Sequence, residues 1–299
     1  MKIKSILVTS IAPMSDHAAN RGEKLLGNAS SVKRRPDGRV YISGQMQRHV
    51  LFSAIERLNE DHPERGETYV ANGDGPSTNI SKDLRSDLGG FLSTSKGEYS
   101  GRRTAPISAT PAVAVNPSSI GRDLLIRLKM NQDTEAQQRQ ALATNEFSTQ
   151  DEMVQSFHLD VGAVGVIKEY SYQDESHVAT TYKSFIDDEE HARRISLFLQ
   201  ATAAMTDYAN QARNAVSGEP NKVLIVLDHK LSRKATRYFQ PETSETERQN
   251  ILGELEKRKA KVFLGDDTST EGLSVAEAYE KALESIKADQ LYRPEYESV

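Results

Sequence analysis

The sequence of 299 residues contains no cysteine. This absence excludes disulfide bonds, thiolate nucleophiles, iron–sulfur clusters and every zinc site with a cysteine ligand. No apolar run approaches the ~18–20 residues that span a bilayer. The segment Met1–Val8 is too short and too interrupted by polar residues for a signal peptide. We therefore expect a cytoplasmic protein without a membrane partner.

Motifs that carry common catalytic chemistry are also missing. The sequence has no G-x-S-x-G nucleophile elbow, no Walker A loop, no H-E-x-x-H and no G-x-G-x-x-G. Its seven histidines are scattered without the i,i+4 spacing of metal ligands. The sequence therefore contains no motif that indicates an enzyme, a metal site or a cofactor site.

Charge is distributed unevenly along the chain. Residues 1–130 carry 19 Lys+Arg and 13 Asp+Glu, a balance of +6, whereas residues 131–299 carry 19 and 30, a balance of -11; together they give the net charge of -5. A basic first half suggests a polyanionic partner on one side of the molecule. An unevenly solvated surface is the alternative.

Hydrophobic periodicity predicts an ordered series of helices and strands. Ser43 is a candidate N-cap for a helix over 43–59, because the apolar residues that follow form one helical stripe. The expected series is a strand at 3–11, this helix, strands at 122–130 and 156–170, a helix at 188–216 and a strand at 222–229. Helices at 244–260 and 274–288 flank a short strand at 261–264.

The first six elements follow the order β-α-β-β-α-β. This is the order of the α+β ferredoxin-like fold, which is also that of the RNA-recognition motif. Insertions at 60–121 and 131–155 interrupt it, and a tail follows at 230–299. We expect a palm-like domain over 1–59 and 116–229, a first insertion ending at 115, a second within the palm span, and a C-terminal extension packed on the palm.

Basic residues lie beside glycine and small polar residues in the first half of the chain. Lys33, Arg34, Arg35 and Arg39 occupy the loop after the first strand, and Arg102 and Arg103 follow Gly101. Ser43, Gly44 and Gln45 begin the first helix, where free backbone N–H groups favour a phosphate, and Arg48 lies one turn further on. Arginine and amide donors match phosphate oxygens. A loop that is merely solvated is the alternative at each place.

The third strand lacks the aromatic platform of RNA-recognition motifs. That position reads Ser156-Phe157-His158-Leu159-Asp160-Val161-Gly162, where a Lys/Arg-Gly-aromatic pattern is expected. Any bound nucleic acid is therefore predicted to contact backbone-directed loops rather than the open sheet face.

Four segments resemble one known family. They are Tyr41–Val50 (YISGQMQRHV), Arg102–Ala114 (RRTAPISATPAVA), Asp87–Leu92 (DLGGFL) and the opening strand with Gly27-Asn28. Over about residues 1–115 the sequence is similar to the DevR-type backbone subunits (the Cas-seven family) of type I CRISPR Cascade complexes, subtype I-B. The similarity is weak in 131–155 and in the C-terminal tail.

The resemblance implies a fold and a function. The family fold is a modified RNA-recognition motif drawn as a hand, with a palm, a finger insertion and a thumb, which here correspond to the insertions. Its members polymerise along the guide RNA (crRNA) as a filament with the other Cascade subunits and leave the bases free to pair with target DNA. Base pairing then reads sequence while the protein reads shape and phosphate.

The resemblance also assigns residues. It implies guide-RNA backbone contact for Ser43, Gln45 and Arg48, and for the loop that carries Asn28, Lys33, Arg34 and Arg35. Arg102 and Arg103 are expected to face RNA or a neighbouring subunit. Acidic surface such as Asp187–Glu190 could meet the basic fingers of the next copy.

Two other functions stay open on the sequence alone. Related subunits of type III complexes cleave RNA with a loop aspartate, and a metal-dependent ribonuclease would use Asp37 with His17 or His49. The turn Pro36-Asp37-Gly38 does not reproduce that motif, so we interpret the chain as non-catalytic. A cytoplasmic scaffold without a nucleic-acid role is the other alternative.

Overall fold

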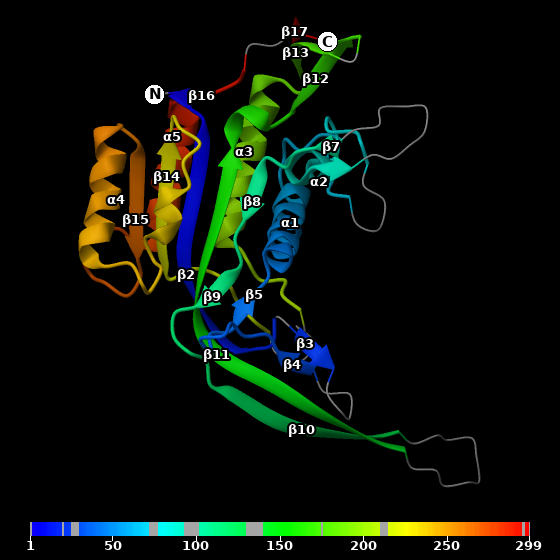
Figure 1. Ribbon diagram of the computed structural model, residues 1–299, viewed down its shortest axis with the longest axis vertical. Helices are drawn as coiled ribbons and strands as arrows, with labels where there is room; N and C mark the ends of the chain where they lie inside the picture. The colour runs from blue at the N-terminus through cyan, green and yellow to red at the C-terminus, as the bar shows by residue number, and fades with distance from the viewer. Residues whose placement is uncertain are drawn as a thin grey trace.

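The computed structural model describes residues 2–19, 21–24, 30–71, 77–92, 102–129, 140–174, 176–209, 215–294 and 297–298. At its centre, an eight-stranded sheet has the order β15-β14-β2-β11-β9-β5, with β8 and β10 also paired to β11 (Figure 1). These strands are β2 (Ser5–His17), β5 (Tyr41–Ile42), β8 (Ile107–Ala109), β9 (Ala112–Ala114), β10 (Ile120–Lys129), β11 (Gln140–Asp160), β14 (Lys222–Asp228) and β15 (Lys261–Asp266).

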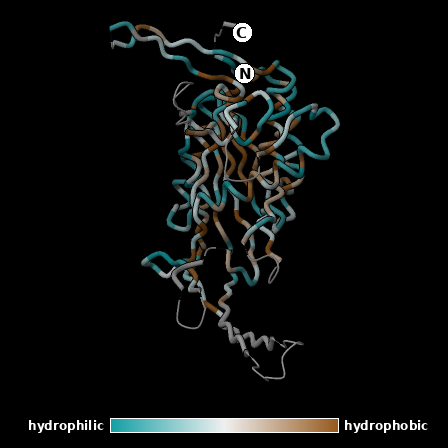
Figure 2. The backbone as a smooth tube through the Cα atoms, turned by 90° about the vertical axis from the view of Figure 1, so that its right-hand side faces the viewer, coloured by the Kyte–Doolittle hydropathy of each residue, from teal (hydrophilic) through white to brown (hydrophobic). Residues whose placement is uncertain are grey.

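Helices cover both faces of this sheet. Five α-helices are described: α1 (Gly44–Glu60), α2 (Leu84–Gly89), α3 (Asp188–Ala203), α4 (Glu245–Lys257) and α5 (Val275–Ala288). Ile6 and Val8 of β2 belong to the large core shared with α1, α3 and α5, whereas Leu7 points the other way into a smaller core with α4. Successive strand residues face opposite sides, so the central strands are apolar on both. Figure 2 shows hydrophobic residues concentrated in these central strands.

Short elements surround the central sheet. Three small sheets pair β3 (Arg21–Lys24) with β4 (Ser30–Val32), β6 (Phe91–Leu92) with β7 (Arg102–Arg103), and β1 (Lys2–Ile3) with β16 (Gln290–Leu291). A further sheet holds β12 (Val166–Gln173), β13 (Ser176–Ser184) and β17 (Glu297–Ser298). Among the residues described, no helix is both long and apolar enough to cross a membrane.

The predicted mixed fold is confirmed, but one palm strand was misplaced. In the ferredoxin-like order, the position beside β11 on the side away from β2 belongs to the second strand, predicted at 122–130. The short strands β8 and β9 fill it instead, with Ile107 and Ala112 buried. Residues 107–109 and 112–114, which the prediction assigns to the first insertion, thus lie in the central sheet.

The segment predicted as that palm strand forms an arm. β10 pairs with 140–149, the first half of β11, over ten residue pairs, and this two-stranded ribbon projects from the sheet (Figure 1). The second half of β11 pairs with β2 from Thr149 to Asp160. The predicted second insertion at 131–155 thus divides into part of the arm and part of the palm, with 130–139 outside the described residues.

Two further boundaries differ from the prediction. The strand predicted over 156–170 ends at Asp160, and a 3-10 turn at Val161–Ala163 leads into β12. The helix predicted to reach 216 ends at Ala203, since Met205 and Tyr208 turn into the core. There the Tyr208 hydroxyl donates to Gln47 at 3.2 Å. This packing outweighs the local helical pattern.

The C-terminal residues form part of the same body. β15 pairs with β14 along the sheet edge, α5 packs in the large core and α4 in the smaller one, and a 3-10 turn lies at Lys234–Arg237. Both predicted C-terminal helices and the strand between them are present within a few residues.

Candidate nucleic-acid interface

The basic loop after the first strand is an ordered hairpin. Arg34 and Val40 form an antiparallel β-bridge. Between them, the N–H of Gly38 donates to the C=O of Arg35 at 3.0 Å, which closes the turn through Pro36 and Asp37. Gly38 adopts a φ of +84°, a conformation that favours glycine. Lys33 and Arg34 are exposed and Arg35 is half-buried. Cationic side chains are therefore held on a defined backbone.

The other charged residues of this hairpin are paired with each other. Arg39 contacts Asp37 and Glu242, at 2.7 Å each. Hydrogen bonds from the Arg39 side chain and backbone lower the pKa of Asp37. The Arg39–Glu242 pair ties the hairpin to the C-terminal part of the chain, so Arg39 is less available to an anion than Lys33 or Arg34.

The hairpin leads through β5 directly into the start of α1. Ser43 is the N-cap, as predicted, with its hydroxyl accepting from Met46 N–H at 3.2 Å. Gly44 allows close packing, because a Cβ there would lie 3.0 Å from the carbonyl oxygen of Ala109. Gln45 is exposed. The first turn of α1 thus presents Gln45 outward, while Gly44 lies against the 109–111 backbone.

Arg48 lies one turn further along and is half-buried. Its Nη2 donates to the C=O of Gly89, at the end of α2, at 2.6 Å. Burial, and secondarily the charge of Arg85, lower the pKa of Arg48. Arg48 therefore joins α1 to the first insertion, and its guanidinium has further donors that this single carbonyl does not use.

Arg103, predicted to face RNA or a neighbouring subunit, is bound within the molecule. Its side chain is 8% exposed, pairs with Asp87 at 2.5 Å and donates to Ala163 C=O at 2.8 Å. It holds the first insertion to the palm. Arg102 lies beside it in β7, but the structure does not describe its side chain. Asn28 lies outside the described residues.

The sheet face that RNA-recognition motifs use is largely covered. Arg233, ahead of the 3-10 turn, donates to Ser108 at 2.9 Å, and the turn and α4 pack over Leu7 and Leu224. His158, on the same face, is 4% exposed, and burial and then Arg233 lower its pKa to about 4. The C-terminal residues thus cover this face, and the avoidance of it by RNA stays a prediction.

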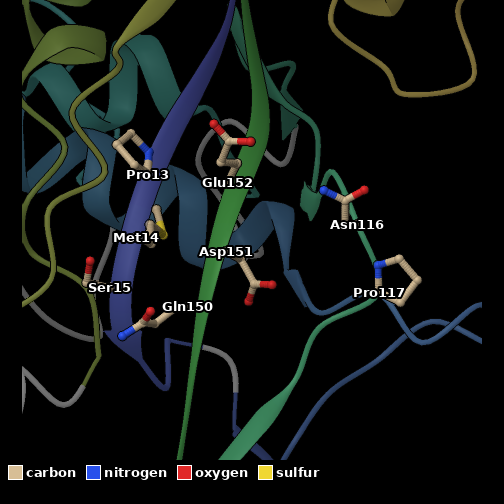
Figure 3. Close-up of a pocket in the computed structure, with 8 residues that line it drawn as sticks. All are labelled: Pro13, Met14, Ser15, Asn116, Pro117, Gln150, Asp151 and Glu152. Carbon is tan, nitrogen blue, oxygen red and sulfur yellow. The ribbon is translucent and has the colours of Figure 1, made fainter. Parts of the chain in front are cut away.

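A polar pocket of about 340 Å³ marks the junction where the arm leaves the palm. Figure 3 shows its lining from β2, from the segment after β9 and from β11: Pro13, Met14, Ser15, Asn116, Pro117, Gln150, Asp151 and Glu152. Asp151 pairs with the fully buried His17 at 3.0 Å. Hydrogen bonds from His17, Ser118 and Thr149 lower the pKa of Asp151 despite its partial burial.

The candidate ribonuclease residues have separate partners. His17 is buried against Asp151, Asp37 pairs with Arg39 in the hairpin, and His49 is exposed on α1. Across the described ranges, no group of three or more His, Cys, Asp or Glu side chains is arranged to hold a metal ion.

The acidic start of α3 is partly engaged within the molecule. Asp187 caps the helix by accepting from Glu190 N–H at 2.8 Å, and Asp188 pairs with Arg293. Glu190 pairs with the buried Arg193 and Arg194. Three of the four acids thus have capping or ion-pairing roles, so the group is not a free acidic patch.

Residues 14–218, more than two thirds of the chain, match the family described as CRISPR-associated negative auto-regulator DevR/Csa2. The chain belongs to the DevR/Csa2 family. This confirms the resemblance from residue 14 to 115 and extends it across the arm and α3. No curated protein sequence matches the chain.

The fold of this DevR/Csa2 chain recurs in solved structures. One, titled "CRISPR RNA-guided surveillance complex, pre-nicking", contains a chain with a TM-score of 0.58 and 11% identity, covering 94% of this chain and 99% of that one. Another, titled "CRISPR RNA-guided surveillance complex", gives 0.50 and 12%, covering 97% and 95%. The similarity includes the C-terminal residues that lie beyond the family match.

Proposed function

We propose that this DevR/Csa2 protein is the guide-RNA-binding backbone subunit of a type I Cascade complex, of subtype I-B. Its partners are the crRNA, further copies of itself, the other Cascade subunits and, through the guide's bases, target DNA. The protein polymerises along the crRNA and holds its phosphates, so that base pairing supplies the sequence specificity.

One structural relationship carries this proposal. The two-residue strand β5 joins the hairpin with Lys33, Arg34 and Arg35 to the first turn of α1 with Ser43 and Gln45. Cationic and neutral hydrogen-bonding groups thus lie at one edge of the sheet, while the C-terminal residues cover the sheet face that RNA-recognition motifs use. Such a surface binds the nucleic-acid backbone and leaves the bases free.

The hand-like organisation follows with corrected boundaries. The palm is α1, α3 and the central sheet without the arm of β10 and the first half of β11, and it includes 107–114. The finger is the insertion that contains α2, β6 and β7, and the thumb is the arm of β10 and the first half of β11. Family membership and fold support this assignment.

The same proposal makes the subunit non-catalytic. The engagement of Asp37 with Arg39 favours a structural role for that carboxylate. We expect the purified protein and its Asp37→Ala variant to behave alike when each is incubated with target RNA and magnesium: neither should show cleavage that depends on Asp37. Magnesium-dependent cleavage lost in that variant would instead favour the ribonuclease.

The deciding experiment is native mass spectrometry of the protein co-expressed with a CRISPR repeat–spacer transcript and its processing partners. Lengthening the spacer in equal steps should add protomers at a fixed increment. A constant one-protein stoichiometry, or complexes without RNA, would overturn the proposal.

A further inference from the structure

Four arginines lie at the contact between α2 and the palm, and they fall into two groups. Arg103 and Arg194 each pair with the carboxylate of Asp87. Arg48 and Arg85 have no such partner: among the described residues, no carboxylate lies within ion-pairing distance of either one.

Arg48 and Arg85 meet at the side chain of Phe52. Cζ of Arg85 lies 5.4 Å from the centroid of the Phe52 ring. A Cβ at Gly89 would lie 3.0 Å from Phe52 and 3.4 Å from Nη2 of Arg48. Because glycine has no Cβ, Phe52 and the Arg48 guanidinium can both pack against this position. α1 and α2 therefore place both guanidinium groups beside Phe52 and Gly89.

The donors of this pair are incompletely used. Arg48 donates to one neutral carbonyl, that of Gly89, and Nε of Arg85 is buried without a hydrogen-bond partner in the described part of the chain. Burial, and then the positive charge of Arg85, lower the pKa of Arg48. Two adjacent, partly desolvated cations are unfavourable unless an anion lies between them.

We propose that Arg48 and Arg85 together bind a single phosphate group. Resting on the proposed function, this phosphate belongs to the guide-RNA backbone as it passes from the start of α1 towards the finger. The planar guanidinium fork matches phosphate oxygens, and two forks on one anion remove the repulsion between them. Arg85 becomes a binding residue beside Arg48, on a different element of the fold.

The first test uses the full-length protein without RNA. Inorganic pyrophosphate, at ionic strength matched with chloride, should raise the thermal unfolding midpoint of the unmodified protein. Arg48→Gln and Arg85→Gln should each remove this increase. The control Arg57→Gln should keep it, because Arg57 is an exposed α1 arginine that donates to Thr206 at 2.9 Å.

The second test measures the salt dependence of guide-RNA affinity. Each single variant should reduce the slope of log K against log salt by about 0.7, the value for one phosphate contact on a single strand. The double variant should lose the same ~0.7 rather than ~1.4, because both side chains bind the same phosphate.

The outcomes separate the site from the function. If neither pyrophosphate stabilisation nor the salt slope changes in Arg85→Gln while Lys33→Ala still weakens RNA binding, the phosphate site is wrong and the RNA-binding function stands. Reductions of the salt slope that add up in the double variant would also overturn the shared site.

If the protein does not bind RNA but loses pyrophosphate stabilisation in both variants, the anion site stands and the guide-RNA function fails. A lower midpoint for Arg85→Gln without any pyrophosphate effect would show that Arg85 serves only the fold, against the proposal.

Discussion

Asp87 and Arg194 form an ion pair at 2.7 Å in which neither side chain is exposed to solvent. Asp87, on α2 of the finger insertion, also pairs with Arg103 and accepts from the backbone N–H of Gly165. One carboxylate thus joins the insertion, the helix α3 and the turn after β11. The position of α2, and with it of Arg85, depends on this carboxylate.

Replacing Asp87 should therefore be strongly destabilising. Asp87→Ala leaves two buried guanidinium groups without their shared partner, and we expect a loss of about 3–5 kcal/mol in the free energy of unfolding. Urea denaturation measures it. The control is Glu67→Ala, which removes the exposed partner of Lys82 and should leave the midpoint unchanged. A loss no larger than that of the control would show that Asp87 does not hold the insertion.

Neutralising the basic hairpin should weaken guide-RNA binding without affecting the fold. The triple variant Lys33→Ala, Arg34→Ala, Arg35→Ala should reduce affinity similarly for all RNA sequences. It should lower the salt slope by up to about 2, at ~0.7 for each lost phosphate contact. Fluorescence anisotropy at several salt concentrations measures both.

A charge-matched control distinguishes this effect from a general loss of positive charge. Lys257, Lys281 and Lys287 are exposed on α4 and α5. Their triple replacement by alanine should leave the slope close to that of the unmodified protein. Equal effects of the two triple variants would favour the solvated-loop interpretation of the hairpin.

Gly90 should tolerate no side chain. Its backbone, with a φ of +69° and a ψ of +169°, lies in a region that only glycine readily adopts. An added Cβ would lie 2.5 Å from the carbonyl oxygen of Arg103. We expect Gly90→Ala to lower the free energy of unfolding by at least about 2 kcal/mol.

Gly66→Ala separates backbone strain from steric overlap at Gly90. Gly66 also has a left-handed φ, of +57°, but a Cβ added there would meet nothing within 4 Å. Its cost should be about 1 kcal/mol, the conformational penalty alone. Thermal denaturation of both variants should rank Gly90→Ala as the less stable; the reverse order would contradict the packing of β6 and β7.

Acid should destabilise the protein through His158. Its pKa of about 4 in the folded state lies below its ordinary value of 6.5, so the unfolded chain binds more protons between these pH values. Stability should therefore fall as pH drops from about 6.5 towards 4. Both imidazole nitrogens are buried without hydrogen-bond partners in the described residues.

The His158→Leu variant checks this origin. At pH 7 it should be at least as stable as the unmodified protein, because it buries no unpaired nitrogen. Urea denaturation at about pH 7 and about pH 5 should show that acidification lowers the free energy of unfolding less in the variant than in the unmodified protein. Some loss should remain, since burial also lowers the pKa of His191 to about 4. If the unfolding free energy falls by the same amount between these pH values in the variant and in the unmodified protein, His158 is not the source of the loss.

Local patterns determined the elements whose signals lie within a few residues of chain. The Ser43 cap, the apolar stripe of α1, the continuous hydrophobic run of β14 and the paired C-terminal helices all follow from short-range periodicity and capping. The family resemblance rested on segments of the same kind. The fold class, the family and the position of the basic hairpin could therefore be predicted from the sequence.

Only the tertiary structure decided which segments complete the sheet and which arginines remain available to an anion. β8 and β9, with three residues each and Pro111 between them, are too short for a periodic signal, and only pairing with β11 makes them strands. Arg103 and Arg48 are alike in sequence as arginines near glycine. Asp87 neutralises the first, whereas the second has Arg85 beside it. Burial and ion pairing depend on residues distant in sequence, and local residue patterns do not contain that information.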